Sequence, residues 1–223
     1  MNIINDKVTE YLEGLYRPVN EDLNSLRIEA ENREIPIILR DTEGLLLNFL
    51  RIKRPRRILE IGAAVGYSAI CFSAVLPEAE IVSLERSEKM YLKALENVER
   101  FGLDRRIRIQ KGDAVEILQE MKARVADQEQ EGFDLVFIDA AKSCYRAFWD
   151  CSVPLCRKGA VIISDNVLIK ARTASDEFIT ERRQKTSVRR MREYLSYITR
   201  LPYADTAVIA VGDGVAVSVL KER

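Results

Sequence analysis

The segment LEIGAAVGYSA, residues 59–69, begins as a short apolar strand and passes through two glycines into a helix. Its strand starts at Arg57, and four more apolar, β-branched runs follow it, separated by helical stretches: EIVSLE, RIRIQKGD, FDLVFIDA and GAVIISDNV. Strands that are apolar on both faces and alternate with helices belong to a parallel sheet that is covered on both sides. The sequence therefore predicts a doubly wound α/β fold.

The flanks of this alternation follow different patterns. Before it, VTEYLEGLY, NEDLNSLRIEAENRE and DTEGLLLNFLRIK predict three helices, with Asn20 as the cap of the second and Asp41 at the start of the third. After it come a helix within residues 181–201 and two alternating runs joined by Gly212-Asp213-Gly214, which predict a hairpin ending the sheet with an antiparallel strand. No linker is evident. We expect one domain over residues 1–223, with a helical cap (1–55) and an α/β core (56–223).

Composition excludes several classes of chemistry. The 223 residues contain no histidine, which excludes serine–histidine hydrolases and histidine-based zinc sites. No apolar run approaches the roughly 20 residues that a membrane span needs, and the amino terminus has no secretory pattern. We therefore expect a cytoplasmic protein that is not bound to a membrane. The net charge is zero, but RIKRPRR (51–57) and residues 170–200 are locally basic.

Ligands of open α/β sheets collect at the carboxyl ends of the strands. The turn after the first strand lacks the dinucleotide fingerprint, because Ala64 and Tyr67 stand where glycines are required. The second strand ends at Glu85, which could accept ribose hydroxyls, and the third is followed by Asp113 and Ala114, beside an adenine. Each of these features alone could be a turn or a helix cap. Together they favour an adenosine with a carboxylate-bearing tail, as in S-adenosylmethionine.

Oxygen donors follow the next two strands. Asp139 ends the fourth strand, and Asp165 and Asn166 follow the fifth. Two carboxylates and an amide, without sulfur or imidazole, suit a hard cation such as Mg²⁺. Asp165 and Asn166 can share a ligand only if the chain is already turning there. The alternative is that Asp139 caps the next helix and Asp-Asn only forms a turn.

The motifs LEIGAAVGYSA, SLER, KGDA, FIDAAKSCY and ISDNV, in this order, resemble the cation-dependent O-methyltransferases of the catechol and caffeoyl-CoA type over residues 35–220. PIILRDTEGLLL, VLIKARTASD and VGDGVAVS are most similar to the bacterial tRNA 5-hydroxyuridine methyltransferases, which form 5-methoxyuridine at the wobble position. The resemblance implies a Rossmann-like S-adenosylmethionine-dependent methyltransferase fold with a seven-stranded, mostly parallel sheet. It also implies a homodimer and the tRNA anticodon loop as partner.

The resemblance also assigns roles to individual residues. Lys142 matches the catalytic lysine, and Mg²⁺ would be held by Asp139, Asp165 and Asn166. The residues implied for S-adenosylmethionine are Ile38, Gly62, Ser68, Glu85, Asp113, Ala114 and Asp139. Departures from the family pattern at residues 38–39 and 143–144 concern the acceptor rather than the reaction.

The acceptor is left open by this pattern. The 5-oxygen and 4-carbonyl of 5-hydroxyuracil offer a chelating pair much as a catechol does. A small catechol-like or phenolic acyl-CoA acceptor is therefore the alternative to tRNA, and a non-catalytic nucleotide-binding module is an alternative of another class. The basic residues of 170–200 could hold phosphates, or they could form a solvated helix face paired to Glu181 and Glu193. Lys142 could accept a proton or act only through its charge.

Overall fold

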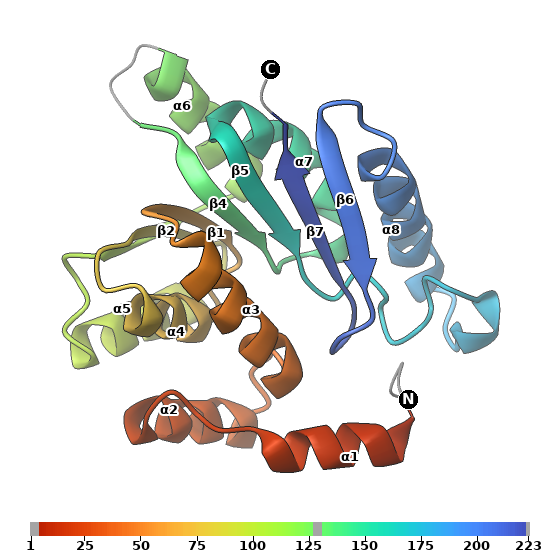
Figure 1. Cartoon of the computed structure of the whole chain (residues 1–223), viewed down its shortest axis with the longest axis horizontal. Helices are drawn as coiled ribbons and strands as arrows, with labels where there is room; N and C mark the ends of the chain where they lie inside the picture. Colours follow the sequence, from red (N-terminus) through yellow and green to blue (C-terminus); the bar gives the residue numbers. More distant parts are fainter. Residues whose placement is uncertain (1–4, 127–130, 222–223) are drawn as a thin grey trace.

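The computed structural model describes residues 5–126 and 131–221, and a seven-stranded sheet of order β3-β2-β1-β4-β5-β7-β6 forms its centre (Figure 1). The strands are β1 (Arg57–Ile61), β2 (Glu80–Glu85), β3 (Ile107–Lys111), β4 (Phe133–Ile138), β5 (Cys156–Ser164), β6 (Ala204–Ile209) and β7 (Val215–Leu220). Strands β1 to β5 pair in parallel, whereas β7 is antiparallel to both β5 and β6. The predicted mostly parallel sheet with an antiparallel carboxyl-terminal strand is confirmed. The hairpin places β7 inside the sheet, so that β6 forms the edge.

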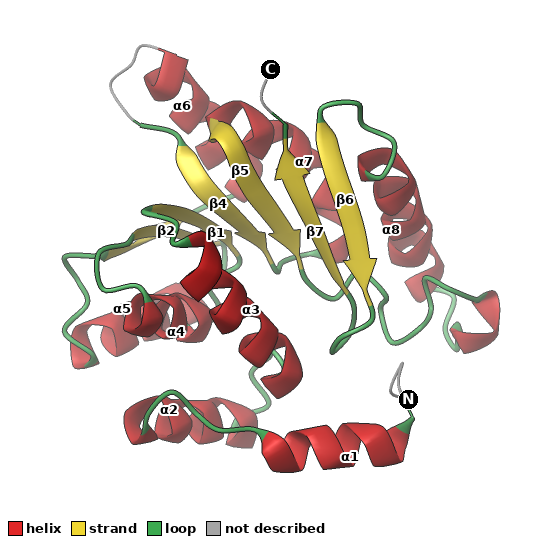
Figure 2. Ribbon diagram, viewed as in Figure 1, coloured by secondary structure: helices red, strands yellow, loops and turns green. Residues whose placement is uncertain are grey.

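Helices cover both faces of the sheet (Figure 2). They are α1 (Asp6–Leu15), α2 (Glu21–Asn32), α3 (Arg40–Lys53), α4 (Tyr67–Val75), α5 (Glu88–Arg100), α6 (Ala114–Ala126), α7 (Tyr145–Ser152) and α8 (Gln184–Ile198), with short 3₁₀ turns η1 (Lys142–Cys144), η2 (Val153–Leu155) and η3 (Asp176–Phe178). Helices α3, α4 and α5 pack together on one face, and α6, α7 and α8 on the other. Within the described ranges, no helix combines the length and apolarity that crossing a bilayer requires.

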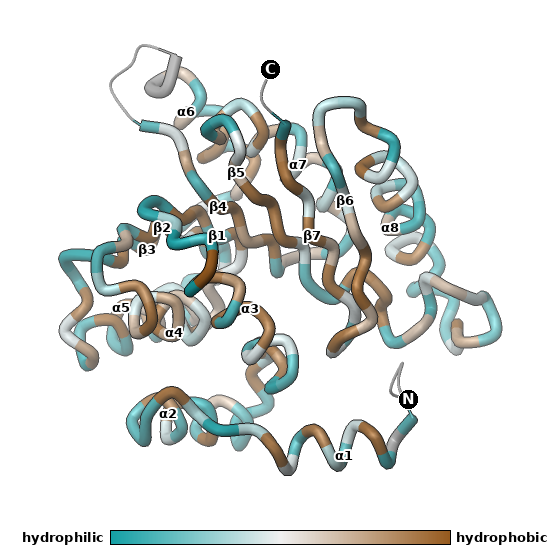
Figure 3. Tube along the Cα trace, in the orientation of Figure 1, coloured by the Kyte–Doolittle hydropathy of each residue, from teal (hydrophilic) through white to brown (hydrophobic). Residues whose placement is uncertain are grey.

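Alternating side chains of each strand divide the core into two layers. In β1, Ile58 belongs to the layer beneath α4, while Leu59 and Ile61 belong to the layer beneath α7. In β4, Phe137 and Ile138 divide in the same way. Figure 3 shows the resulting hydrophobic strands at the centre of the molecule. Because both faces of these strands are buried, the sequence runs are almost continuously apolar.

The first three helices precede the sheet, and α1 and α2 pack against α3 and α4 (Figure 1). The Asn20 side chain accepts a hydrogen bond from the Leu23 amide at 2.9 Å, which confirms the predicted cap of α2. Helix α3 begins at Arg40, one residue before the predicted start. The Asp41 carboxylate accepts the amide of Gly212 at 2.8 Å. This contact ties α3 to the β6–β7 turn.

Candidate active site

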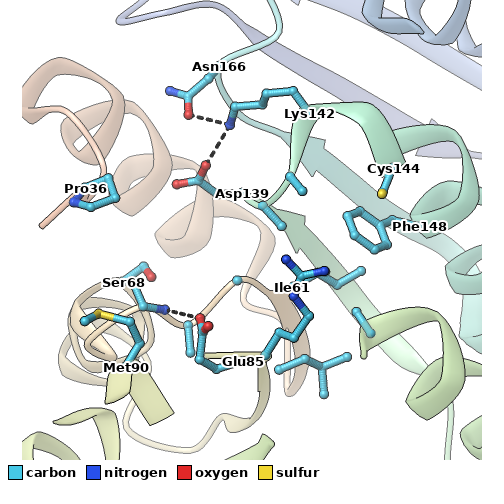
Figure 4. Close-up of a pocket in the computed structure, with 18 of the residues that line it drawn as sticks. Pro36, Ile61, Ser68, Glu85, Met90, Asp139, Lys142, Cys144, Phe148 and Asn166 are labelled. Atoms are coloured by element: carbon cyan, nitrogen blue, oxygen red, sulfur yellow. Dashed lines mark hydrogen bonds and ion pairs between the residues drawn. The ribbon is translucent and has the colours of Figure 1, made fainter. Parts of the chain in front are cut away.

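A cavity of about 520 Å³ lies at the carboxyl ends of the parallel strands, beside the switch point between β1 and β4. Figure 4 shows Asp139, Lys142 and Asn166 together at one end of the cavity, and Ser68 and Glu85 at the other. The predicted site residues that line the cavity are Ile38, Gly62, Ser68, Glu85, Asp113, Ala114, Asp139, Lys142 and Asn166. The remaining one, Asp165, is fully buried beside Asn166. Residues predicted from motifs far apart in the sequence therefore meet in one place.

The conformation of the glycine turn after β1 is set by contacts within the protein. Gly62 has φ of +106°, and a Cβ there would lie 2.0 Å from the Asp139 carbonyl oxygen. The missing side chain thus lets the ends of β1 and β4 approach each other. The Gly66 amide donates to the Ala63 carbonyl at 2.7 Å, so it is already engaged within the turn. The amides that could receive an anionic group of a ligand are those of the first residues of α4, which have no intrahelical partner.

Glu85 and Asp113 both make backbone hydrogen bonds at the rim. Glu85 accepts the amide of Ala64 at 2.9 Å and that of Ser87 at 2.7 Å, so it braces the glycine turn. Asp113 accepts the Val115 amide at 2.9 Å and caps the start of α6. The helix-cap alternative is therefore realised at Asp113. Because each carboxylate oxygen has two lone pairs, both residues can still accept from a ligand.

Glu60 is a buried acid that sequence reasoning did not assign. It lies near the carboxyl end of β1, is fully buried, and accepts hydrogen bonds from the hydroxyls of Ser68 and Ser83. Burial raises the pKa of Glu60 to about 7, although the two hydroxyls favour the charged form. The available signal was an acid inside an otherwise apolar strand. Glu60 holds Ser68 at the cavity wall.

Lys142 links the oxygen donors that follow β4 and β5. Its Nζ lies 3.1 Å from Asp139 Oδ1 and 2.7 Å from Asn166 Oδ1 (Figure 4). Asn166 has φ of +53°, which confirms that the chain turns immediately after β5. The two oxygens thus face one positive charge. The Lys142 side chain is 25% exposed and is engaged in the site, unlike a solvated surface lysine.

Asp165 supplies a buried carboxylate next to this pair. Its Oδ1 accepts the Asn166 amide at 2.6 Å, whereas Oδ2 has no hydrogen-bond partner among the described residues. Burial, and then repulsion from Asp139, raise the pKa of Asp165 to about 7. No cluster of three acidic, cysteine or histidine side chains suited to a metal occurs in residues 5–126 and 131–221, so the third protein ligand would be the Asn166 amide. An unpartnered carboxylate oxygen in an all-oxygen donor set fits a hard divalent cation.

Tyr145 is a second residue that sequence reasoning missed. Its hydroxyl accepts from Lys142 Nζ at 3.0 Å and donates to the Asp165 carbonyl at 2.8 Å. Burial, followed by the charges of Asp139 and Asp165, holds the pKa of Tyr145 well above its usual value, so the hydroxyl stays protonated. The K-x-x-Y spacing in FIDAAKSCY was the available signal. Tyr145 fixes Lys142 against the ends of β4 and β5.

Three of the nine basic residues in the stretch 170–200 around α8 pair with acids. Arg183 pairs with Glu181, and Arg189 lies 3.5 Å from Glu193, as the solvated-face alternative proposed. Arg192 pairs with Asp176 at 2.7 Å and also donates to backbone carbonyls. Arg190 reaches the active site, where it donates to the Ser143 carbonyl at 3.3 Å. Part of the charge of α8 therefore serves the local structure.

A cavity at the switch point of the sheet, with acids at the end of β2 and after β3 and oxygen donors after β4 and β5, is the arrangement that the sequence predicted for an S-adenosylmethionine-dependent methyltransferase. A family model described as O-methyltransferase matches residues 18–221. The chain therefore belongs to the O-methyltransferase family, as its motifs predicted.

Individual relatives support this assignment over nearly the whole chain. A catechol O-methyltransferase of Niastella koreensis is 28% identical over 99% of both proteins. A caffeoyl-CoA O-methyltransferase of Populus kitakamiensis is 28% identical over 92% of this chain and 88% of its own length. The crystal structure of a Bacillus cereus O-methyltransferase in complex with SAH has a TM-score of 0.80 and 27% identity, covering 96% of this chain and 97% of that one. The specific resemblance to tRNA 5-hydroxyuridine methyltransferases stays a prediction.

Proposed function

We propose that this enzyme methylates one of two adjacent oxygens on an aromatic or heteroaromatic ring. In this proposal Asp139, Asp165 and Asn166 hold a divalent cation, and their oxygen donors favour Mg²⁺. The carrying observation is the convergence of the Asp139 and Asn166 oxygens on one ammonium group at the end of the cavity. The unpartnered Asp165 oxygen beside them supports the same conclusion. A chelating pair of acceptor oxygens suits a cation that keeps open coordination positions.

In this proposal, the residues at the two ends of the cavity have different roles. A bound cation would stabilise the ionised form of the acceptor oxygen. Lys142 lies beside that position, where it can accept the proton or balance the negative charge, and Tyr145 fixes the direction of its ammonium group. Ser68, held by Glu60, and Glu85 form the opposite end of the cavity, where they would hold the methyl donor. This arrangement would bring donor and acceptor to the roughly 3–3.5 Å needed for in-line transfer.

The acceptor class with most support is a small catechol-like or phenolic acyl-CoA compound. Relatives that align along nearly the whole chain carry the names catechol and caffeoyl-CoA O-methyltransferase. Two of the four basic residues of α8, Arg189 and Arg192, are paired with acids, which weakens the electrostatic argument for a nucleic acid.

A second candidate is the wobble 5-hydroxyuridine of tRNA, with the anticodon loop as partner. One observation favours it: Arg190 extends from α8 to the carbonyl of Ser143, next to Lys142. An exposed guanidinium at the rim could meet a phosphate next to a base inserted in the cavity. The ring of 5-hydroxyuracil presents the same adjacent oxygens as a catechol.

One experiment separates these acceptors. Purified enzyme with S-adenosylmethionine and Mg²⁺ is offered catechol, caffeoyl-CoA and tRNA lacking wobble methylation, and products are measured by mass spectrometry. Methylated phenol alone supports the first candidate, whereas 5-methoxyuridine alone supports the second. Asp165→Asn is the matched control, because it removes one charge from the site while preserving the shape of the side chain. No transfer to any of the three acceptors would overturn the proposal and favour a non-catalytic nucleotide-binding module.

A further inference from the structure

A charged network is buried outside the reacting end of the cavity, where α1, α2, α3 and α4 meet. Its centre is Arg27 of α2, which is 1% exposed. The guanidinium donates to Glu43 at 2.6 Å, to Glu31 at 3.1 Å, to the Tyr67 hydroxyl at 3.0 Å and to the Ile38 carbonyl at 2.9 Å. Few arginines are buried so completely, and they are buried only when paired.

Glu43 of α3 is the anionic half of this network and is also 1% exposed. Besides Arg27, it accepts hydrogen bonds from the hydroxyls of Tyr16 and Tyr67, both at 2.7 Å. Burial, and then the hydrogen bond to Glu43, raise the pKa of Tyr16 to about 12, so this hydroxyl remains a donor. One carboxylate thus joins the segment after α1, helix α2 and the start of α4.

The network makes hydrogen bonds to two segments that line the cofactor cavity. Ile38, in the segment between α2 and α3, and Tyr67, the first residue of α4, both line the cavity. Arg27 bonds to both of them directly. Tyr67 also adjoins Ser68 and the glycine turn. A shift of this guanidinium would therefore move the Ile38 wall away from the first turn of α4.

Stability alone is a weak reason for such an arrangement. Buried ion pairs often contribute no more to stability than well-packed apolar side chains of similar volume, because both charges lose their hydration. We propose that Arg27 and Glu43 are positioning residues, which fasten the amino-terminal helices to the start of α4 and thereby set the shape of the S-adenosylmethionine cavity. The inference relies on the proposed function only for the ligand of this cavity.

The test uses the full-length double variant Arg27→Met/Glu43→Gln. It removes both charges together, so that neither is left buried without a partner, and the introduced glutamine keeps an oxygen for the tyrosine hydroxyls. Isothermal titration should show SAH binding weakened by about tenfold or more, the scale of a lost charged hydrogen bond. The KM for S-adenosylmethionine should rise in parallel, while kcat at saturating donor changes less than about threefold.

The matched control is Glu29→Gln, which removes an exposed ion pair of the same helix, with Arg100 at 3.0 Å. It should leave SAH binding unchanged. A folded double variant that binds SAH within twofold of the wild type would overturn the proposal, even if its melting temperature fell.

If the double variant does not fold, the single variant Arg27→Lys tests the same proposal. Lysine keeps the charge but has only three N–H donors for the four partners of Arg27, and it lacks the planar fork of a guanidinium, so an unchanged KM for S-adenosylmethionine would refute positioning. A wild type that does not bind SAH would instead refute the proposed function.

Discussion

Glu60→Gln should change how the stability of this enzyme depends on pH. Glu60 is fully buried in β1, with two serine hydroxyls as its hydrogen-bond partners. Glutamine has nearly the same shape and does not ionise. Its carbonyl can accept from one serine hydroxyl, and its amide can donate to the other, because a hydroxyl serves as donor or acceptor. The substitution therefore removes a buried charge and keeps the hydrogen-bonding geometry.

The magnitude follows from the pKa of Glu60, which burial raises from 4.5 to about 7. Between these values the folded protein retains a proton that the unfolded chain releases, so this group lowers stability as the pH rises from 4.5 to 7. A pKa difference of about 2.5, at 1.36 kcal/mol per pKa unit, corresponds to about 3 kcal/mol. Most of it, roughly 2.5 kcal/mol, develops between pH 5 and pH 8. The glutamine variant does not ionise, so its stability should not fall for this reason as the pH rises.

Urea unfolding of both proteins at pH 5, 6, 7 and 8, with a chelator present, measures the effect. The free energy of unfolding of the variant minus that of the wild type should increase by about 2–3 kcal/mol over this range and level off above pH 7. Comparing this difference across pH cancels the contributions of other titrating groups. Glu78→Gln, at an exposed turn, controls for the loss of one negative charge. A difference that varies by less than about 1 kcal/mol would show that Glu60 is charged in the folded protein throughout.

Further predictions concern the metal, the lysine, the backbone and the subunit interface. Excess Mg²⁺ should raise the melting temperature of the wild type but not that of Asp165→Asn, measured by scanning fluorimetry; equal rises would argue against the site. Lys142→Met should lower kcat by about 10²–10⁴ with SAH binding unchanged, and near-normal turnover would exclude its catalytic role. Lys170→Gly should raise the free energy of unfolding by about 0.5–1 kcal/mol in urea, because this exposed residue has φ of +51°, which glycine adopts without strain. Lys122→Gly within α6 is the control and should lower the free energy of unfolding by about 1 kcal/mol. Destabilisation by both substitutions would contradict the prediction. The predicted homodimer could use the apolar edge strand β6, so Ile209→Glu, at a residue 39% exposed, should reduce the mass measured by light scattering; an unchanged dimer mass would exclude this face.

The sheet and the position of the site were predictable for one reason. Buried parallel strands must be apolar on both faces, so their runs stand out, and EIVSLE coincides with β2 from its first residue to its last. Polar residues directly after such runs must collect at one edge of the sheet. Asp139 and Asn166 lie 27 residues apart in the sequence, yet they share the Lys142 ammonium group.

The parts that escaped prediction are those that depend on tertiary partners. Arg27 reads as an ordinary helix arginine, because Glu43 and Tyr67 lie 16 and 40 residues away in the sequence. The role of Gly62 depends on the Asp139 carbonyl, which occupies the space where a side chain of residue 62 would lie. Buried polar groups require a partner, but the sequence does not say where in the chain that partner lies.

The same distinction bears on the choice of acceptor. In the proposed function, Asp139, Asp165 and Asn166 hold a cation at the ends of two central strands, and that cation would bind any ring with two adjacent oxygens. Selection must therefore come from groups around the cavity mouth, which belong to loops and to α8. Arg190 is such a group, because its contact with the Ser143 carbonyl is a single exposed hydrogen bond that a phosphate could replace at small cost. A charge held this loosely can serve an anionic acceptor without altering the chemistry beneath it, and so one reaction centre can be directed to different substrates.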